Sequence, residues 1–164
     1  MRILIAAGGT GGHINPAIAI ANELKQRNPD ASFLFVGCRD RMEASLVPKA
    51  GFDIKFIKSE GYNRKNIITN LKTAVIVFKA INSAKKIIRE FKPDIVIGTG
   101  GYVSAPTVMA AQKLKIKTVI HEQNAFIGMS TRMLSKKADI VFLSFPKNAN
   151  TVVTKGKLII SGNP

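Results

Sequence analysis

Ile3-Leu4-Ile5-Ala6-Ala7-Gly8-Gly9-Thr10-Gly11-Gly12-His13-Ile14-Asn15-Pro16 is the stretch that decides the fold. Its branched apolar run predicts a buried parallel strand, and its glycine cluster predicts a turn into a helix, with Asn15 as N-cap and Pro16 at the first helical position. Glycines let a ligand approach the backbone closely, and a helix start offers unpaired N–H groups and a positive dipole end. The stretch therefore suits a phosphate or pyrophosphate. A glycine turn that only allows strand and helix to pack is the alternative.

Composition narrows the class of protein and of partner. A chain of 164 residues is long enough for one domain that buries about 70% of its unfolded surface. Its single cysteine, Cys38, excludes an internal disulfide and a cysteine metal cluster. The 25 Lys and Arg residues against 10 Asp and Glu give a formal charge of +15, which favours anionic partners. Nucleic acid is not expected as a partner, because neither stacking aromatic residues nor zinc-finger spacing is present.

The rest of the chain alternates strand-like and helix-like segments. The apolar run at the N-terminus is too short for the core of a signal peptide, and no run reaches the about 20 residues that a membrane-spanning helix needs. Further strands are predicted at residues 33–37, 52–57, 94–98, 118–121, 139–143 and 158–160. This order predicts an α/β fold with a doubly wound parallel sheet of about seven strands, Rossmann-like in topology. Right-handed crossovers then place every strand-to-helix loop at one edge, where ligands of such folds bind.

Three of these loops carry unusual residues. Besides the first glycine loop, the strand at 94–98 leads into a second glycine-rich turn, Gly98-Thr99-Gly100-Gly101-Tyr102-Val103-Ser104-Ala105-Pro106. The strand at 118–121 leads into His121-Glu122-Gln123-Asn124. Because the three loops converge at one edge, we expect them to form one site with two anion cradles.

The segment after Gly61 predicts a helix with two apolar stripes. At about 100° per residue, one stripe contains Ile67, Leu71, Ala74, Val75, Phe78 and Ile81, and the other contains Val77, Ala80, Ala84, Ile87, Ile88 and Phe91. If the second stripe packs on the sheet, a continuous helix turns the first outward, where basic residues flank it. Such a surface is typical of an interfacial membrane contact, here predicted for Ile67, Leu71, Lys72, Val75, Phe78 and Lys79. A kink near residues 74–78 that buries both stripes is the alternative.

These motifs together resemble the N-terminal half of the MurG family, bacterial glycosyltransferases of peptidoglycan synthesis. The resemblance covers all 164 residues and depends on the order of the motifs. They are Gly8-Gly9-Thr10-Gly11-Gly12-His13 with Pro16, Asp40-Arg41-Met42-Glu43 with Leu46-Val47-Pro48, Lys92-Pro93-Asp94, Gly100-Gly101-Tyr102-Val103-Ser104 with Pro106, His121-Glu122-Gln123-Asn124, and the final Gly162-Asn163-Pro164. The resemblance implies the N-terminal half of a GT-B enzyme, with residues 1–164 as its acceptor- and membrane-binding domain and the donor-binding C-terminal domain absent from this chain.

The resemblance also implies an activity and a location. Members of the family transfer N-acetylglucosamine from UDP-N-acetylglucosamine to undecaprenyl-linked muramoyl-pentapeptide, converting lipid I to lipid II with inversion. They act as peripheral proteins at the cytoplasmic face of the bacterial inner membrane, next to its anionic surface. This half is expected to be inactive alone. A non-catalytic membrane-anchoring subunit of a split glycosyltransferase is the alternative function.

Site residues follow from the same resemblance. Thr10, Gly11, Gly12 and Asn124 are expected near the donor, and Gly100, Gly101, Tyr102 and Ser104 near the diphosphate of the acceptor. His13 is the candidate general base, since a histidine near a helix N-terminus tends to stay neutral at pH 7. Glu122 could serve instead. For His13 a capping or packing role stays open, for Glu122 that of a supporting hydrogen-bond acceptor or surface ion pair, and for Asn124 and Tyr102 turn chemistry and a half-buried ring.

No cofactor or metal is expected. No Asp-x-Asp pair follows any predicted strand, so the sequence offers no obvious ligand set for a divalent ion and a metal-independent transferase is predicted. A dinucleotide-binding oxidoreductase is disfavoured by two mismatches. Ile14 stands where its fingerprint needs a third glycine, and Gly37-Cys38-Arg39 stands where it needs an acidic residue.

Overall fold

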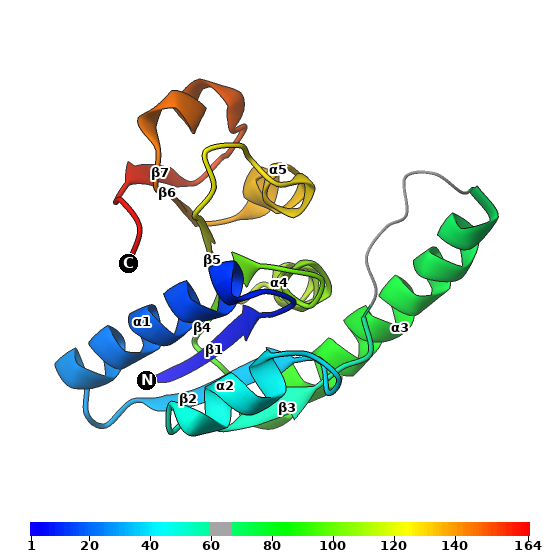
Figure 1. The fold of residues 1–164 in the computed structure, drawn as a ribbon, viewed down its shortest axis with the longest axis horizontal. Helices are drawn as coiled ribbons and strands as arrows, with labels where there is room; N and C mark the ends of the chain where they lie inside the picture. The colour runs from blue at the N-terminus through cyan, green and yellow to red at the C-terminus, as the bar shows by residue number, and fades with distance from the viewer. Residues whose placement is uncertain (60–66) are drawn as a thin grey trace.

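The computed structural model of the chain describes residues 1–59 and 67–164, the side chains of residues 67–74 excepted. Its centre is a parallel sheet of seven strands in the order β3-β2-β1-β4-β5-β6-β7 (Figure 1). The strands are β1 (Arg2–Ala7), β2 (Ser32–Gly37), β3 (Ile54–Phe56), β4 (Ile95–Gly100), β5 (Lys117–Glu122), β6 (Ile140–Leu143) and β7 (Lys157–Ile160). The predicted doubly wound sheet is confirmed, and the strand order reverses between β1 and β4. Such a reversal point is where open α/β sheets bind ligands.

Helices cover both faces of the sheet (Figure 1). They are α1 (Gly11–Arg27), α2 (Glu43–Lys49), α3 (Ile67–Phe91), α4 (Ser104–Lys113) and α5 (Met129–Leu134), with 3₁₀ turns η1 (Ser135–Lys137) and η2 (Pro146–Thr151). Side chains alternate between the two faces along each strand. Leu4 packs on the face covered by α3, α4 and α5, whereas Ile3 and Ile5 pack on the face covered by α1 and α2. Both cores are apolar, so the strands are buried on both sides as in other α/β folds.

Helix α1 begins earlier than the sequence analysis predicts. Thr10 is its N-cap in extended conformation, with φ −137° and ψ 157°, and Gly11 is the first helical residue. The prediction of Asn15 as N-cap with Pro16 at the first helical position is therefore wrong. The backbone of Thr10 already closes the first turn, since its carbonyl oxygen accepts the N–H of His13 at 3.0 Å. As a result His13 lies in the first turn of α1 rather than in the loop before it.

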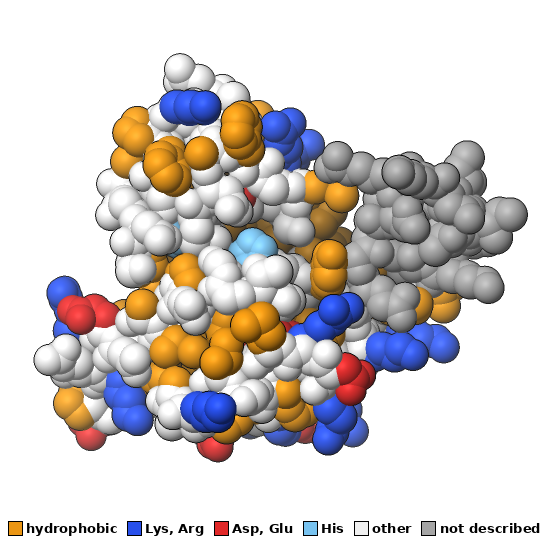
Figure 2. All heavy atoms as spheres, viewed as in Figure 1, with side chains coloured by type: hydrophobic (Ala, Val, Ile, Leu, Met, Phe, Trp, Pro, Cys, Tyr) orange, Lys and Arg blue, Asp and Glu red, His pale blue; other side chains and the backbone are white. Residues whose placement is uncertain are grey.

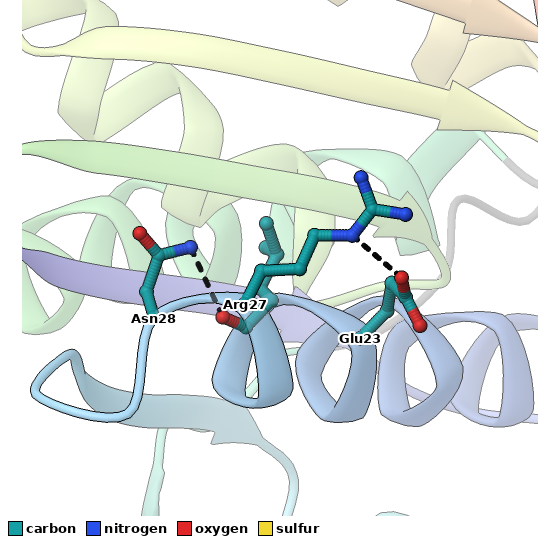
Figure 3. A network of polar contacts seen from close by, with 4 residues as sticks. Glu23, Arg27 and Asn28 are labelled. Atoms are coloured by element: carbon teal, nitrogen blue, oxygen red, sulfur yellow. Dashed lines mark hydrogen bonds and ion pairs between the residues drawn. The ribbon is translucent and has the colours of Figure 1, made fainter.

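The other end of α1 is closed by polar contacts at the surface (Figure 3). The side-chain amide of Asn28 donates to the carbonyl oxygen of Leu24 at 3.2 Å, which satisfies one of the last carbonyls of the helix. One turn earlier, Glu23 accepts a bond from Arg27 Nε at 2.6 Å, and both side chains are exposed. The predicted end of this helix at Asn28-Pro29-Asp30 is confirmed.

Helix α3 is one continuous helix, so the alternative of a break near residues 74–78 is not observed. Ala80, Ala84 and Ile88 are buried against the sheet, as expected for the second stripe. Val75 and Phe78 of the first stripe are 51% and 62% exposed. The side chains of Ile67, Leu71 and Lys72 lie outside the described residues.

Ile81 was wrongly assigned to the outward stripe, because it is only 5% exposed. At about 100° per residue it lies about 60° from Ala84, within the buried arc, whereas Val75 lies on the opposite side. None of the helices in the described part of the chain is long and apolar enough to cross a bilayer.

Candidate functional site

The two glycine loops meet where β1 and β4 end, at the reversal point of the sheet. Gly101 has φ +83°, and a Cβ atom there would collide with the carbonyl oxygen of Gly8. A side chain is therefore excluded both by the backbone conformation and by the neighbouring loop. Neither α1 nor α4 has an acidic residue in its first turn. The positive ends of both helix dipoles are thus left uncompensated beside the loops, which favours an anion there.

His13 is held against the second glycine loop by its side chain and by its backbone. Its Nδ1 lies 3.1 Å from the carbonyl oxygen of Thr99, and Thr99 Oγ1 donates to the carbonyl oxygen of His13 at 2.8 Å. Gly100, with φ +112°, provides the space, because a Cβ atom there would lie 2.5 Å from His13 Nδ1. A carbonyl oxygen only accepts hydrogen bonds, so the proton belongs on Nδ1 and the lone pair on Nε2.

Gln123 connects His13 to the second histidine of the chain, His121. Its Oε1 lies 3.4 Å from His13 Nδ1, and its Nε2 lies 3.0 Å from His121 Nδ1. His121 Nε2 in turn donates to the carbonyl oxygen of Gly162 at 3.2 Å. Burial lowers the pKa of His121, although the Gly162 carbonyl and the Glu122 carboxylate oppose this shift. His121 is therefore neutral at pH 7, with its proton on Nε2.

Glu122 is buried, and its carboxylate is fully engaged within its own loop. Oε1 accepts the backbone N–H of Asn124 at 3.1 Å and the side-chain amide of Asn124 at 2.8 Å. Oε2 accepts the N–H of Gly128 at 2.9 Å and the hydroxyl of Thr131 at 2.7 Å. Four donors on one buried carboxylate favour the supporting role that the sequence left open over that of a base. Glu122 thereby fixes the side-chain amide of Asn124, and the backbone carbonyl oxygen of Asn124 accepts a further bond from Asn148 Nδ2 at 3.1 Å.

Of the remaining predicted residues, all but Ser104 lie where the site was expected. Thr10, Gly11 and Gly12 lie at the start of α1, and Tyr102, 51% exposed, lies in the second glycine loop. Ser104 differs from the expectation, because it is 2% exposed and packs beneath β4, where a Cβ atom on Gly98 would lie 2.5 Å from its Oγ. Its side chain therefore does not reach the surface of the site.

Sequence reasoning did not assign roles to Thr99, His121 and Gln123. The signal available for Gln123 was its place between two candidate residues, but strand alternation alone does not tell which side chain turns toward His13.

On the face of the molecule shown in Figure 2, the charged side chains lie mostly around the rim. Histidine, hydrophobic and uncharged side chains occupy the hollow near its centre. Among the described residues, no group of three or more His, Cys, Asp or Glu side chains is arranged to hold a metal ion.

Residues 3–143 match the family model described as the glycosyltransferase family 28 N-terminal domain. The whole chain is 48% and 46% identical to proteins from Alkaliphilus oremlandii and Oenococcus oeni. Both are named UDP-N-acetylglucosamine–N-acetylmuramyl-(pentapeptide) pyrophosphoryl-undecaprenol N-acetylglucosamine transferase. The chain spans 45% and 44% of the length of these two relatives.

Solved structures show the same likeness. The crystal structure of Acinetobacter baumannii MurG is 34% identical, with a TM-score of 0.82 over 99% of this chain and 46% of that one. A UDP-GlcNAc 2-epimerase from Neisseria meningitidis, solved with UDP-GlcNAc bound, is 17% identical with a TM-score of 0.70. At that identity the second likeness concerns the fold alone.

Proposed function

This chain belongs to glycosyltransferase family 28, and we propose that it forms the acceptor-side half of an enzyme that transfers N-acetylglucosamine. The donor is UDP-N-acetylglucosamine, and the acceptor is undecaprenyl-linked N-acetylmuramoyl-pentapeptide, so the reaction converts lipid I to lipid II. The proposal is supported by relatives that are 44–48% identical over the full chain and are named as N-acetylglucosamine transferases acting on this lipid-linked acceptor. The single structural observation that carries it is the pair of hydrogen bonds that hold His13 against Thr99 in the second glycine loop.

His13 acts as the general base in this proposal. The acceptor hydroxyl attacks the anomeric carbon of the donor sugar while Nε2 of His13 takes its proton, and UDP leaves with the electron pair of the bond it shared with the sugar. Attack from the face opposite the leaving group inverts the anomeric centre. The proton on Nδ1 is held by Thr99, which keeps the lone pair on Nε2 for this step. The imidazolium formed would share that Nδ1 proton with two acceptors, the Thr99 carbonyl and Gln123 Oε1.

The two glycine loops bind the diphosphate in this proposal. The starts of α1 and α4 supply N–H groups and positive dipole ends, and Tyr102 lies in the second loop with half of its side chain exposed. Glu122 fixes the loop that carries Asn124, next to the donor sugar. The second half that the relatives contain would supply most donor contacts, and no step in this scheme needs a metal ion.

The first stripe of α3 serves as the membrane contact. Val75 and Phe78 expose apolar side chains beside the exposed Lys79, and this pairing suits the interface of an anionic bilayer. A lipid-linked acceptor keeps its lipid in the bilayer, so a peripheral contact on the same domain brings its diphosphate within reach of the loops. We place the enzyme at the cytoplasmic face of the bacterial inner membrane.

The test is transfer by a protein in which this chain is followed by the second half of the Alkaliphilus oremlandii relative. We expect it to move radiolabelled N-acetylglucosamine from UDP-N-acetylglucosamine to the lipid-linked acceptor, with activity retained in a chelator. The chain alone should transfer nothing and bind the donor only in the millimolar range, about −4 kcal/mol. Micromolar donor binding by the chain alone would contradict this division of labour. Activity that appears only on mixing with a separate natural chain would instead identify a subunit of a split enzyme.

A further inference from the structure

Glu43, the first residue of α2, is a completely buried carboxylate beneath the first glycine loop. Its Oε2 accepts the backbone N–H of Gly9 at 3.0 Å, and its Oε1 accepts the backbone N–H of Cys38 at 2.9 Å. No ion pair to Glu43 occurs among the described residues. One carboxylate therefore joins the loop after β1 to the end of β2, and backbone donors alone stabilise its charge.

Two glycines make room for this side chain. A Cβ atom on Gly8 would collide with Glu43 Oε1, and a Cβ atom on Gly37 would lie 2.5 Å from Glu43 Cγ. Gly8, directly after β1, and Gly37, the last residue of β2, therefore lack side chains at the positions beside the carboxylate and its stem. Part of the glycine content of the first loop thus accommodates Glu43, and only the rest is free to face a ligand.

We propose that Glu43 is a positioning residue that sets which N–H groups of the first glycine loop face the diphosphate. Gly9 has φ +90°, and a Cβ atom added there would meet no atom within 4 Å outside its two chain neighbours, so nothing packs against that side of the residue. The bond to Glu43 turns the Gly9 N–H inward and fixes the Gly8–Gly9 peptide, two residues before the helix start at Gly11. The N–H groups of Gly11 and Gly12, at the start of α1, are then left for the ligand. This inference rests on the proposed function, because it takes a substrate diphosphate as the ligand.

The decisive variant is Glu43→Gln, which keeps the shape of the side chain. Its amide presents two donors where the carboxylate presented an acceptor, so one of the two backbone N–H groups loses its partner. The matched control is Glu23→Gln, which changes an exposed carboxylate on α1 that pairs with Arg27. Glu43→Asp, which withdraws the carboxylate by one methylene, is the second variant if Glu43→Gln does not fold.

Two readouts use this chain alone, and one uses the fusion with the second half. In a titration with inorganic pyrophosphate that is monitored by amide NMR, Glu43→Gln should show an about tenfold larger dissociation constant. This is the change expected for the loss of one hydrogen bond to a charged group. Exchange of the Gly9 N–H with deuterium should be at least about tenfold faster. In the fusion, KM for the acceptor should rise more than kcat falls. Glu23→Gln should match the wild type in all three.

A lowered melting temperature with unchanged pyrophosphate affinity would make Glu43 merely structural and overturn the proposal. So would a wild-type chain without saturable pyrophosphate binding. If the fusion transfers no sugar but Glu43→Gln still weakens pyrophosphate binding and speeds Gly9 exchange, the proposed function fails and the positioning role of Glu43 stands.

Discussion

Nδ1 of His13 lies 3.1 Å from the carbonyl oxygen of Thr99, and the Thr99 hydroxyl returns a bond to the His13 carbonyl. This reciprocal pair ties the start of α1 to the end of β4, across the point where the sheet reverses its strand order. It also selects one tautomer of the imidazole, with the lone pair on Nε2. A histidine restrained at Nδ1 with its other nitrogen unpaired among the described residues is suited to accept a proton.

Replacing His13 tests this role in the fusion with the second half. His13→Ala should lower kcat by roughly 10²–10⁴-fold, the usual contribution of a general base. His13→Asn keeps a donor near the Nδ1 position but lacks Nε2, so it should be as slow as His13→Ala while folding better. A loss confined to KM in both variants would assign His13 to positioning.

Glu122→Gln tests whether the third loop is held by its buried carboxylate. The new amide meets four donors, so the free energy of unfolding should fall by about 1–3 kcal/mol. Turnover should fall as well, with the shape of the pH–rate profile unchanged. Thr131→Val removes one of the four donors at similar volume and should show a smaller loss of both. If Glu122→Gln instead abolished the acidic limb of the profile at unchanged stability, Glu122 would be the base.

Gly101→Ala tests the contact between the two glycine loops. The new methyl group meets the carbonyl of Gly8 at φ +83°, so strain and collision both act. Gly51→Ala is the control, because Gly51 has φ +79° but no neighbour within 4 Å of a Cβ position. We expect Gly51→Ala to cost about 1–2 kcal/mol in urea unfolding, and Gly101→Ala to cost clearly more. Equal costs would mean that the loops separate freely.

Burial of His121 predicts a pH dependence of stability. Burial lowers its pKa in the folded chain, whereas the unfolded chain keeps an ordinary value of about 6.5. Below that pH the unfolded state takes up the proton first, so the free energy of unfolding should fall as the pH drops from about 6.5 toward the folded-state pKa. Urea unfolding between pH 5 and 8 measures this. His121→Gln keeps a donor near the Nε2 position, and it should lose that part of the slope. An unchanged slope would assign the pH dependence to other groups.

The membrane contact predicts binding of this chain to vesicles with anionic lipid. Val75→Ser with Phe78→Ser should weaken binding even at low salt, since a fully inserted apolar side chain contributes roughly 1.5–3 kcal/mol. Lys72→Glu with Lys79→Glu should remove mainly the salt-sensitive part, at about 1 kcal/mol per cation near the surface. Val153→Ser, which changes another exposed apolar side chain, is the control. Intact binding together with a much lower melting temperature would mean that the α3 stripe is core.

The sequence by itself determined the sheet and which loops come together at its edge as the candidate site. Alternating strand and helix signals are local, and right-handed crossovers leave few ways to connect them, so seven parallel strands with their three unusual loops at one edge followed from the pattern. The outward turn of Val75 and Phe78 followed from helical periodicity, because angle accumulates regularly along a helix. The misplaced start of α1 shows where local signals fail. Asn15 and Pro16 are good start residues, but Thr10 already closes the first turn.

Only the tertiary structure decided which side chains act on one another. The bonds from His13 to Thr99 and from Glu43 to Gly9 join residues 86 and 34 positions apart, and such distances carry no periodic signal. Gly8 and Gly101 look alike in the sequence, yet one makes room for Glu43 and the other for the opposite loop. Glu122 could have been a base until its four donors were known. The physical reason is that hydrogen-bond partners and steric space at a parallel-sheet edge come from loops distant in the chain, and only the packed sheet brings them into register.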